Sequence, residues 1–378
     1  MSAHASAPAP AATRTGLRHV VSHLLVPVLL ATGMALAYLG AFHQPDPHGV
    51  RIDVVGRGPA ASVLAQSVQD RLGDRVAVRT VATADDARNA LAERQIAGAY
   101  VSDPVRPTLM IASAASDTTA VTVERMLSPV ALAQGLPLQV EDVAPAADSD
   151  PTSQGIFFYL VALSVGAYSA AIAIAVAGGR LAMRIRMLLA VGVAGVISLI
   201  CTLVAGPLYG ALPNSTGQIG LLAWLYTTAI VLIGIGLHTF LGRWTTGSLV
   251  GLFVMLNFTS AGGVFAPALQ PDFFASLHSF WIGSALVEAG RNLMYFPGLG
   301  IGHQVLVLLL WLAAGLGVAG VAALVGQRRG PAAAPVAPEP QPEPATEPDV
   351  NAKDRVVRDR VARDGNVAEE LEESVPVG

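Results

Sequence analysis

Two histidines and an aspartate lie within the stretch HQPDPH, where His43, Asp46 and His48 are residue types that bind zinc. Ligands of one metal must converge, as histidines four residues apart on a helix do. Pro45 and Pro47 instead hold this backbone extended, so the three side chains do not converge. The stretch therefore favours a rigid hinge over a metal site. We expect no metal and no organic cofactor.

A carboxylate and a guanidinium lie three residues apart in ALVEAGRNLMYF, as Glu288 and Arg291. At this spacing on a helix the two groups can form an ion pair. Next to apolar segments, such a pair either neutralises itself or belongs to a substrate site. The pattern favours self-neutralisation and leaves the substrate role open.

The segment NFTSAGGVFAP, residues 257–267, places polar residues and glycines inside an apolar run. The residues that predict a broken helix are Asn257, Thr259, Ser260, Gly262 and Gly263. Broken backbone at membrane depth is tolerated only inside protein or beside water. Two interpretations are equally open: the segment lines a lateral or outward-facing cavity, or the helix ends early and its polar residues lie at the outer membrane interface.

The sequence lacks the motifs of several enzyme classes. Lys353 is the only lysine, and no glycine-rich loop precedes it, which excludes a P-loop ATPase. The sequence also contains no GxSxG or HExxH and no GxGxxG that follows a strand and opens a helix, which argues against a membrane hydrolase. Cys201 is the only cysteine, and a net charge of −4 without a basic patch argues against nucleic acid. We therefore expect that the chain is not an enzyme.

Six apolar runs are long enough to cross a bilayer, which takes about 20 residues. The runs are 19–42, 156–178, 187–209, 218–241, 246–266 and 303–326. Charged residues make up only 13% of the chain, against about a quarter in soluble proteins. The first run exceeds the length of a signal-peptide core, which favours an uncleaved anchor over cleavage near Ala41. We predict an α-helical polytopic membrane protein with six transmembrane helices.

Arginine placement predicts the orientation, because cytoplasmic flanks are enriched in basic residues. With the N-terminus inside, only Arg291 lies in a short outer loop. The cytoplasmic flanks then hold Arg14, Arg18, Arg180, Arg184, Arg186, Arg243, Arg328 and Arg329. We expect a multi-pass protein of the plasma membrane with both termini cytoplasmic: a tail at 1–18, helix 19–42, and a Pro/Glu-rich disordered tail at 327–378.

Residues 43–154 follow the first transmembrane helix and are predicted to form an extracytoplasmic α/β domain. Strands are expected where apolar and polar residues alternate, and helices where the period is 3.6. The expected strands are VRIDVVG, RVAVRTVA, AGAYVS, TLMIAS and PLQVEDV, and the expected helices are SVLAQSVQDRL, DDARNALAERQI and TTAVTVERMLSPVALAQG.

Four stretches resemble a known family. They are YLGAFHQPDPHGVRIDVVG after a helix containing Pro27, ALAERQIAGAYVSD, NFTSAGGVFAPALQPDFF and ALVEAGRNLMYF. Together they resemble actinobacterial membrane proteins of the phage-infection-protein type (YhgE/Pip), relatives of ABC type-2 exporter permeases. The resemblance covers residues 20–326 and implies one span, an outer domain, a five-helix membrane domain at 155–326 with a re-entrant segment at about 267–300, and a dimer.

The loop GGRLAMRIRM departs from the pattern of permeases that dock an ATPase, because it carries no acidic residue. Arg180, Arg184 and Arg186 instead favour topology-setting contacts with anionic lipid over a cytoplasmic coupling contact.

No central Asp, Glu or His lies in predicted spans two to six, which argues against an ion-coupled transporter. Small residues, including Gly247 and Gly251 in a GxxxG motif, favour close helix packing and a homodimer.

The leading hypothesis is the membrane subunit of an ABC type-2-like exporter of amphiphilic or lipid-like cargo, powered by a separate ATPase. The alternative is a non-transporting envelope protein whose outer domain binds a partner, a phage or a cell-wall component. Either protein has the lipid bilayer as a partner, and neither binds nucleic acid.

Overall fold

The computed structural model describes residues 10–328, which form one compact unit and are mostly helical. We call residues 50–142 the α/β region and residues 155–328 the helical region. The predicted tail at 327–378 lies outside the described residues except for its first two. Residues 1–9 of the predicted tail at 1–18 also lie outside them.

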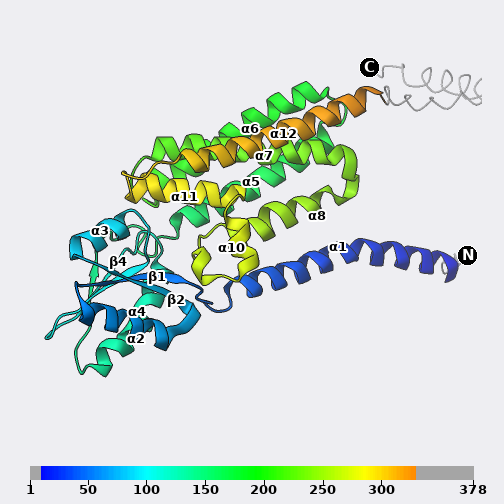
Figure 1. Cartoon of the computed structure of the whole chain (residues 1–378). Coiled ribbons are helices and arrows are strands. Elements are labelled where there is room, and N and C mark those ends of the chain that lie inside the picture. Colours follow the sequence, from blue (N-terminus) through cyan, green and yellow to red (C-terminus); the bar gives the residue numbers. More distant parts are fainter. Residues whose placement is uncertain (1–9, 329–378) are drawn as a thin grey trace, which may run out of the picture. The chain divides into compact units, whose positions relative to one another are not determined.

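Helix α1 spans Pro10–Phe42 and leads to the sheet (Figure 1). Residues 10–18 of the predicted tail are therefore helical, and the candidate span within α1 is Leu24–Phe42. Pro27 lies within the helix without ending it.

Five strands form the sheet of the α/β region, in the order β2-β1-β3-β4-β5. Only the β3–β4 pair is antiparallel. The strands are β1 Val50–Val55, β2 Val76–Val81, β3 Gly98–Val101, β4 Thr108–Ile111 and β5 Gln139–Asp142. All five lie where the alternating pattern predicted strands. In β1 the alternate residues Val50, Ile52 and Val54 are fully buried.

Three helices cover the two faces of this sheet: α2 Pro59–Leu72, α3 Ala84–Ala92 and α4 Asp117–Ala133. Apolar residues of α2 and α4 pack on one face, and those of α3 pack on the other. All three helices were predicted. The side chain of Thr83 caps α3, with Asp86 completing a capping box. The region is therefore a three-layer α/β/α sandwich.

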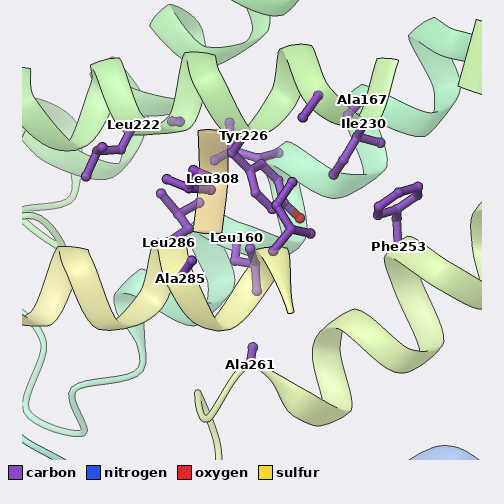
Figure 2. Packing of buried hydrophobic residues seen from close by; sticks show 14 of the residues in the cluster. Leu160, Ala167, Leu222, Tyr226, Ile230, Phe253, Ala261, Ala285, Leu286 and Leu308 are labelled. Carbon is purple, nitrogen blue, oxygen red and sulfur yellow. The ribbon is translucent and has the colours of Figure 1, made fainter. Parts of the chain in front are cut away.

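Helix α7 is the central helix of the helical region and packs against α5, α6, α11 and α12. Figure 2 shows Leu222, Tyr226 and Ile230 of α7 directed into a core that also holds Leu160 and Leu286. The helices are α5 Gly155–Ala177, α6 Met183–Leu203, α7 Thr216–Leu241, α8 Thr245–Val250, α9 Asn257–Ser260, α10 Asp272–His278, α11 Ile282–Tyr295 and α12 Gly302–Arg328.

Five helical runs within the described residues are long and apolar enough to cross a membrane. They are Leu24–Phe42, Gly155–Ala177, Met183–Leu208, Thr216–Ser260 and Gly302–Gln327. The expectation of a multi-pass membrane protein is thus supported, whereas the count of six is not confirmed. The predicted runs 218–241 and 246–266 belong to one continuous run of 45 residues. A 3₁₀ turn at Gly242–Trp244 divides this run, and α8 leads back towards α10 (Figure 1).

The second half of that run ends where the polar residues and glycines predicted a broken helix. A π-helical turn at Gly251–Leu256 (η4) leads into α9, which stops at Ser260, six residues before the end of the apolar run at residue 266. The hydroxyls of Thr259 and Ser260 donate to carbonyls of the preceding turn, and Gly262 has a φ of +71°. Only glycine adopts that conformation without strain, so the helix cannot continue through it. The short helices α10 and α11 then occupy the range 267–300.

Candidate functional site

Four ionisable side chains form a charged cluster where the α/β region meets the helical region: Arg94, His278, Glu288 and Arg291. The Oε2 atom of Glu288 lies 2.6 Å from Nη2 of Arg94, and its Oε1 atom lies 3.1 Å from Nη1 of Arg291. Nε2 of His278 lies 4.0 Å from the same Oε1. The predicted Glu288–Arg291 pair is therefore formed, and Arg94 joins it from outside the helical region.

Helix α11 positions Arg291 inside the protein, where its side chain is only 2% exposed. Nη1 donates to the carbonyl of Gly262 at 2.7 Å, and Nη2 donates to the carbonyl of Gly263 at 3.3 Å. These carbonyls follow the end of α9 and would otherwise be buried without partners. Arg291 therefore holds the unwound backbone after α9 in place.

Glu288 is a charged carboxylate at neutral pH. Burial alone would raise its pKa, but the charges of Arg94 and Arg291, joined by His278 once that imidazole is protonated in acid, lower the pKa to about 2. Its side chain is 16% exposed. Since it accepts from two guanidinium groups, this carboxylate is neutralised by the cluster rather than by a proton.

Arg94 reaches the cluster from the turn that follows α3. Its backbone has a φ of +55°, which is left-handed and uncommon for a residue with a side chain. Nη1 donates to Oδ1 of Asn292 at 2.7 Å, and the guanidinium carbon lies 5.5 Å from the ring centre of Phe296. Arg94 thus makes three kinds of contact with α11 and the residue after it: an ion pair, a hydrogen bond and a cation–π contact.

His278 ends α10 and contacts the broken helix. Its Nδ1 lies 2.9 Å from the carbonyl oxygen of Ser260, and because a carbonyl can only accept, Nδ1 carries a proton. Burial lowers the pKa of His278, so the imidazole is neutral at pH 7. The amide of Gln270 donates to the carbonyl of Thr259 at 2.7 Å. The carbonyls at the end of α9 are therefore satisfied by side chains from three later segments.

A second polar site, the polar network, lies inside the helix bundle and consists of Ser164, Tyr226 and Asn257. Nδ2 of Asn257 donates to Oη of Tyr226 at 2.7 Å and to Oγ of Ser164 at 3.3 Å. The hydroxyls of Ser164 and Tyr226 are 2.5 Å apart. Asn257 is fully buried. It is not among the residues that line the cavity described below.

A cavity of about 590 Å³ lies beside the charged cluster. One wall comes from the α/β region and includes Arg51 and Arg94. The other comes from the helical region and includes Ala266–Ala268, His278 and Glu288. The residues immediately after the broken helix thus line a cavity, although the predicted residues 257–263 do not.

The three arginines of the α5–α6 connection lie apart from this cavity. Arg186 donates to the carbonyls of Gly179 and Leu181, at 2.6 and 3.1 Å, and so stabilises its own loop. Arg180 and Arg184 are exposed. Helix α6 begins at Met183, four residues before the predicted start, so Arg184 and Arg186 belong to its first turn.

The stretch HQPDPH is extended and attached to the helical region. The backbone N–H groups of Asp46 and His48 donate to the carbonyls of Leu269 and Ala268, at 3.0 and 2.8 Å. His43 faces back to the carbonyl of Leu39. Among residues 10–328, no three His, Cys, Asp or Glu side chains gather closely enough to hold a metal.

Comparison of the chain with protein-family models, with curated proteins and with solved structures gave no match. The site must therefore be interpreted from its own geometry.

Sequence reasoning missed Arg94, His278 and the partners of Asn257. Arg94 and Asn292 are 198 residues apart in the sequence, so no local pattern connects them. The predicted helix DDARNALAERQI contained Arg94, so its place in a turn after α3 was not foreseen either. For Tyr226 and Ser164 no local signal exists, since single hydroxyls are common in apolar helices.

Proposed function

We propose that this protein is the membrane subunit of an exporter of amphiphilic cargo, resembling the ABC type-2 and YhgE/Pip proteins, and that it works as a homodimer driven by a separate ATPase. The observation that carries the proposal is the buried helix break after Ser260, which leads directly into a cavity wall at Ala266–Ala268. Irregular backbone at membrane depth is tolerated where it is enclosed by protein or lines a cavity. A pathway for cargo beside this break accounts for both features.

The proposed topology has six crossings. A run of 45 residues is about twice the length that one crossing needs, and it turns at Gly242–Trp244, so we assign two crossings to it. Arg180 and Arg184 follow the end of α5, and Arg243 follows the end of α7. Since basic residues favour the cytoplasmic side, these ends face the cytoplasm and the α/β region lies outside the cell.

The proposal that energy comes from another chain rests on the acidic residues. Asp272 and Glu288 are the only acidic residues between positions 155 and 327, and neither lies in a candidate span. Glu288 is held charged by two arginines, and its pKa of about 2 makes it unsuited to carry protons near pH 7. Proton-coupled transporters use carboxylates that exchange protons within the membrane.

The exposed Arg180 and Arg184 are the residues we assign to contact with the ATPase or with anionic lipid. The test is a pull-down of the full chain in mild detergent, with recovery of a nucleotide-binding chain as the expected result. Replacing both residues by glutamate should abolish recovery and efflux of a fluorescent amphiphile, whereas Arg71→Glu, in the α/β region, should change neither. Recovery and efflux that are indifferent to the double substitution would contradict the coupling role.

The alternative function is a non-transporting envelope protein whose α/β region binds a partner. Three large aliphatic side chains of that region, Val63, Val105 and Leu132, are 69–75% exposed, which gives a partner apolar surface to cover. A strain whose phenotype requires the α/β region but not Arg180 or Arg184 would favour this alternative. A cysteine placed at Arg71 and reacted with a membrane-impermeant maleimide in intact cells tests the outside location that both functions require.

A further inference from the structure

The cavity beside the charged cluster has the size and position of a binding site. Its volume of about 590 Å³ lies within the ~300–1,000 Å³ range of small-molecule sites. It is lined from both the α/β region and the helical region, and interfaces between folded parts are common places for ligands.

Fixed positive charges outnumber negative charges in the lining. Three arginines, Arg51, Arg94 and Arg291, line the cavity, and Glu288 is the only carboxylate among the lining residues. Glu288 accepts from Arg94 and Arg291, so one of those two positive charges remains uncompensated. Arg51 makes no ion pair among the described residues and donates only to the carbonyl of Gln95, at 3.2 Å. The walls therefore carry about two positive charges in excess. Asp150 lies near Arg291 but does not line the cavity.

The side chain of Arg94 is 19% exposed, whereas that of Arg291 is only 2% exposed. Within the described residues, Nε of Arg94 and Nε of Arg291 have no hydrogen-bond partner. A buried donor without a partner is costly, and a guanidinium offers five N–H groups suited to planar, oxygen-rich anions such as phosphate or carboxylate. Both Nε atoms have almost no accessible surface, so a ligand in the cavity would meet the other N–H groups of these arginines rather than Nε.

The cavity lies next to a segment suited to a membrane surface. Helix α10 and the residues after it expose the rings of Phe273 and Phe280, at 61% and 51%. Aromatic side chains are enriched at the depth of lipid head groups. His278, between these two rings in the sequence, lines the cavity. The polar end of an amphiphile at this depth would therefore be close to the arginines.

We propose that this cavity binds the phosphate-bearing head of an anionic amphiphile, with Arg51, Arg94 and Arg291 as the cationic groups of the site. This inference rests on the proposed export function and names the head group that the cargo would carry. Arg51 and Arg94 come from the α/β region and Arg291 comes from α11, so the head is bound between the two regions. Glu288 competes with the ligand for Arg94.

The test uses the full chain in a phosphate-free, uncharged detergent and two probes measured separately by titration calorimetry. The probes are inorganic phosphate and dihexanoyl phosphatidylglycerol below its micelle concentration. Binding of both with similar Kd identifies a site for the phosphate alone, and binding of the lipid only identifies a lipid-head site. Absence of binding by both probes would overturn the inference.

Substitutions assign the binding to this cavity. Arg51→Gln removes an exposed charge without breaking an ion pair, so the protein should fold, and we expect Kd to rise about fivefold. Glu288→Gln should lower Kd, because it removes the competing carboxylate. Arg71→Gln is the matched control: it too donates only to one backbone carbonyl, that of Pro129, and it does not line the cavity. Equal effects of Arg51→Gln and Arg71→Gln would show non-specific attraction and would also overturn the inference.

The two proposals fail separately. Recovery of an ATPase partner without phosphate binding would overturn this inference and leave the exporter intact. Phosphate binding without any ATPase partner or efflux would overturn the exporter proposal and leave the phosphate-binding site intact.

Discussion

The charged cluster and the polar network are both buried polar sites, but they use different chemistry in different places. The network places neutral hydroxyl and amide groups inside the bundle, where Asn257 is fully buried. The cluster places charges between the two regions, beside a cavity, where Glu288 keeps 16% of its side chain exposed. Desolvating a charge costs several kcal/mol more than desolvating a neutral group, so charges are kept close to opposite charges and to water.

The two sites connect different parts of the molecule. The network joins helices α5, α7 and α9 with one another, whereas the cluster joins the α/β region to the helical region. Substitutions in the cluster should therefore have large, pH-dependent effects. Those in the network should have smaller effects that do not vary with acidity.

The largest expected effect belongs to Arg291→Ala. This change leaves the carbonyls of Gly262 and Gly263 unpaired and leaves Glu288 with one guanidinium, which should lower the free energy of unfolding by about 3–5 kcal/mol. The thermal midpoint in detergent measures it. Arg88→Ala is the control, because its ion pairs are on the surface and contribute about 0–1 kcal/mol. Equal losses in the two variants would remove the contrast between buried and exposed pairs.

Acidification should destabilise the folded protein by protonating His278 and Glu288 of the charged cluster. Burial lowers the pKa of His278 below its ordinary 6.5, so the unfolded chain takes up that proton first and stability falls below about pH 6.5. The unfolded Glu288 protonates from about pH 4.5, whereas the folded carboxylate holds its charge down to about pH 2, and stability falls further by about 3 kcal/mol. Both signs agree.

Unfolding midpoints between pH 7 and pH 2.5 measure this profile. Glu288→Gln should flatten it below pH 5 and keep the fall near pH 6. Tyr226→Phe should shift all midpoints equally. A Glu288→Gln profile parallel to that of the wild type would contradict the assignment.

Close packing around the network can be tested with a methyl group. A Cβ atom at Gly283 would collide with Oδ1 of Asn257, so Gly283→Ala should destabilise the protein by about 1–3 kcal/mol. Gly251→Ala meets no atom within 4 Å and should be neutral or slightly stabilising. Similar midpoints for the two variants would mean that Asn257 does not lie against α11.

The smallest expected effect is that of Tyr226→Phe. Its hydroxyl contacts Ser164 and Asn257, so its removal should cost about 1–2 kcal/mol. Tyr100→Phe is the control in the α/β region, because the Tyr100 hydroxyl is buried and has no partner among residues 10–328. That variant should be neutral or more stable. Chemical unfolding of both variants distinguishes them, and a greater loss in Tyr100→Phe would reverse the expected order.

The sequence predicted elements much better than contacts. The five strands and three α-helices of the α/β region were all predicted; the strands were recognised because alternation in segments such as VRIDVV is set by the two faces of a sheet. The apolar helices were predicted by length and composition. The ends of α5, α7 and α12 lie within two residues of the predicted bounds, and α9 ends at Ser260, inside the predicted break, whereas α6 begins four residues before its predicted start.

The residues of the candidate site likewise fall into those that the sequence predicted and those that it did not. Glu288 and Arg291 were found because a helix brings residues three apart together. Arg94 could not be assigned to them, because its approach depends on how a left-handed turn after α3 meets α11. The partners of Asn257 depend likewise on the packing of α5 and α7, which composition does not specify.

The most direct test is a double-mutant cycle on Arg94→Gln and Glu288→Gln in the full chain, with unfolding free energies measured in detergent at pH 7. A contact between the two regions predicts a coupling energy of about 1–3 kcal/mol between these residues. A coupling below about 0.3 kcal/mol would show that the α/β region and α11 do not meet through this pair, and would contradict the account.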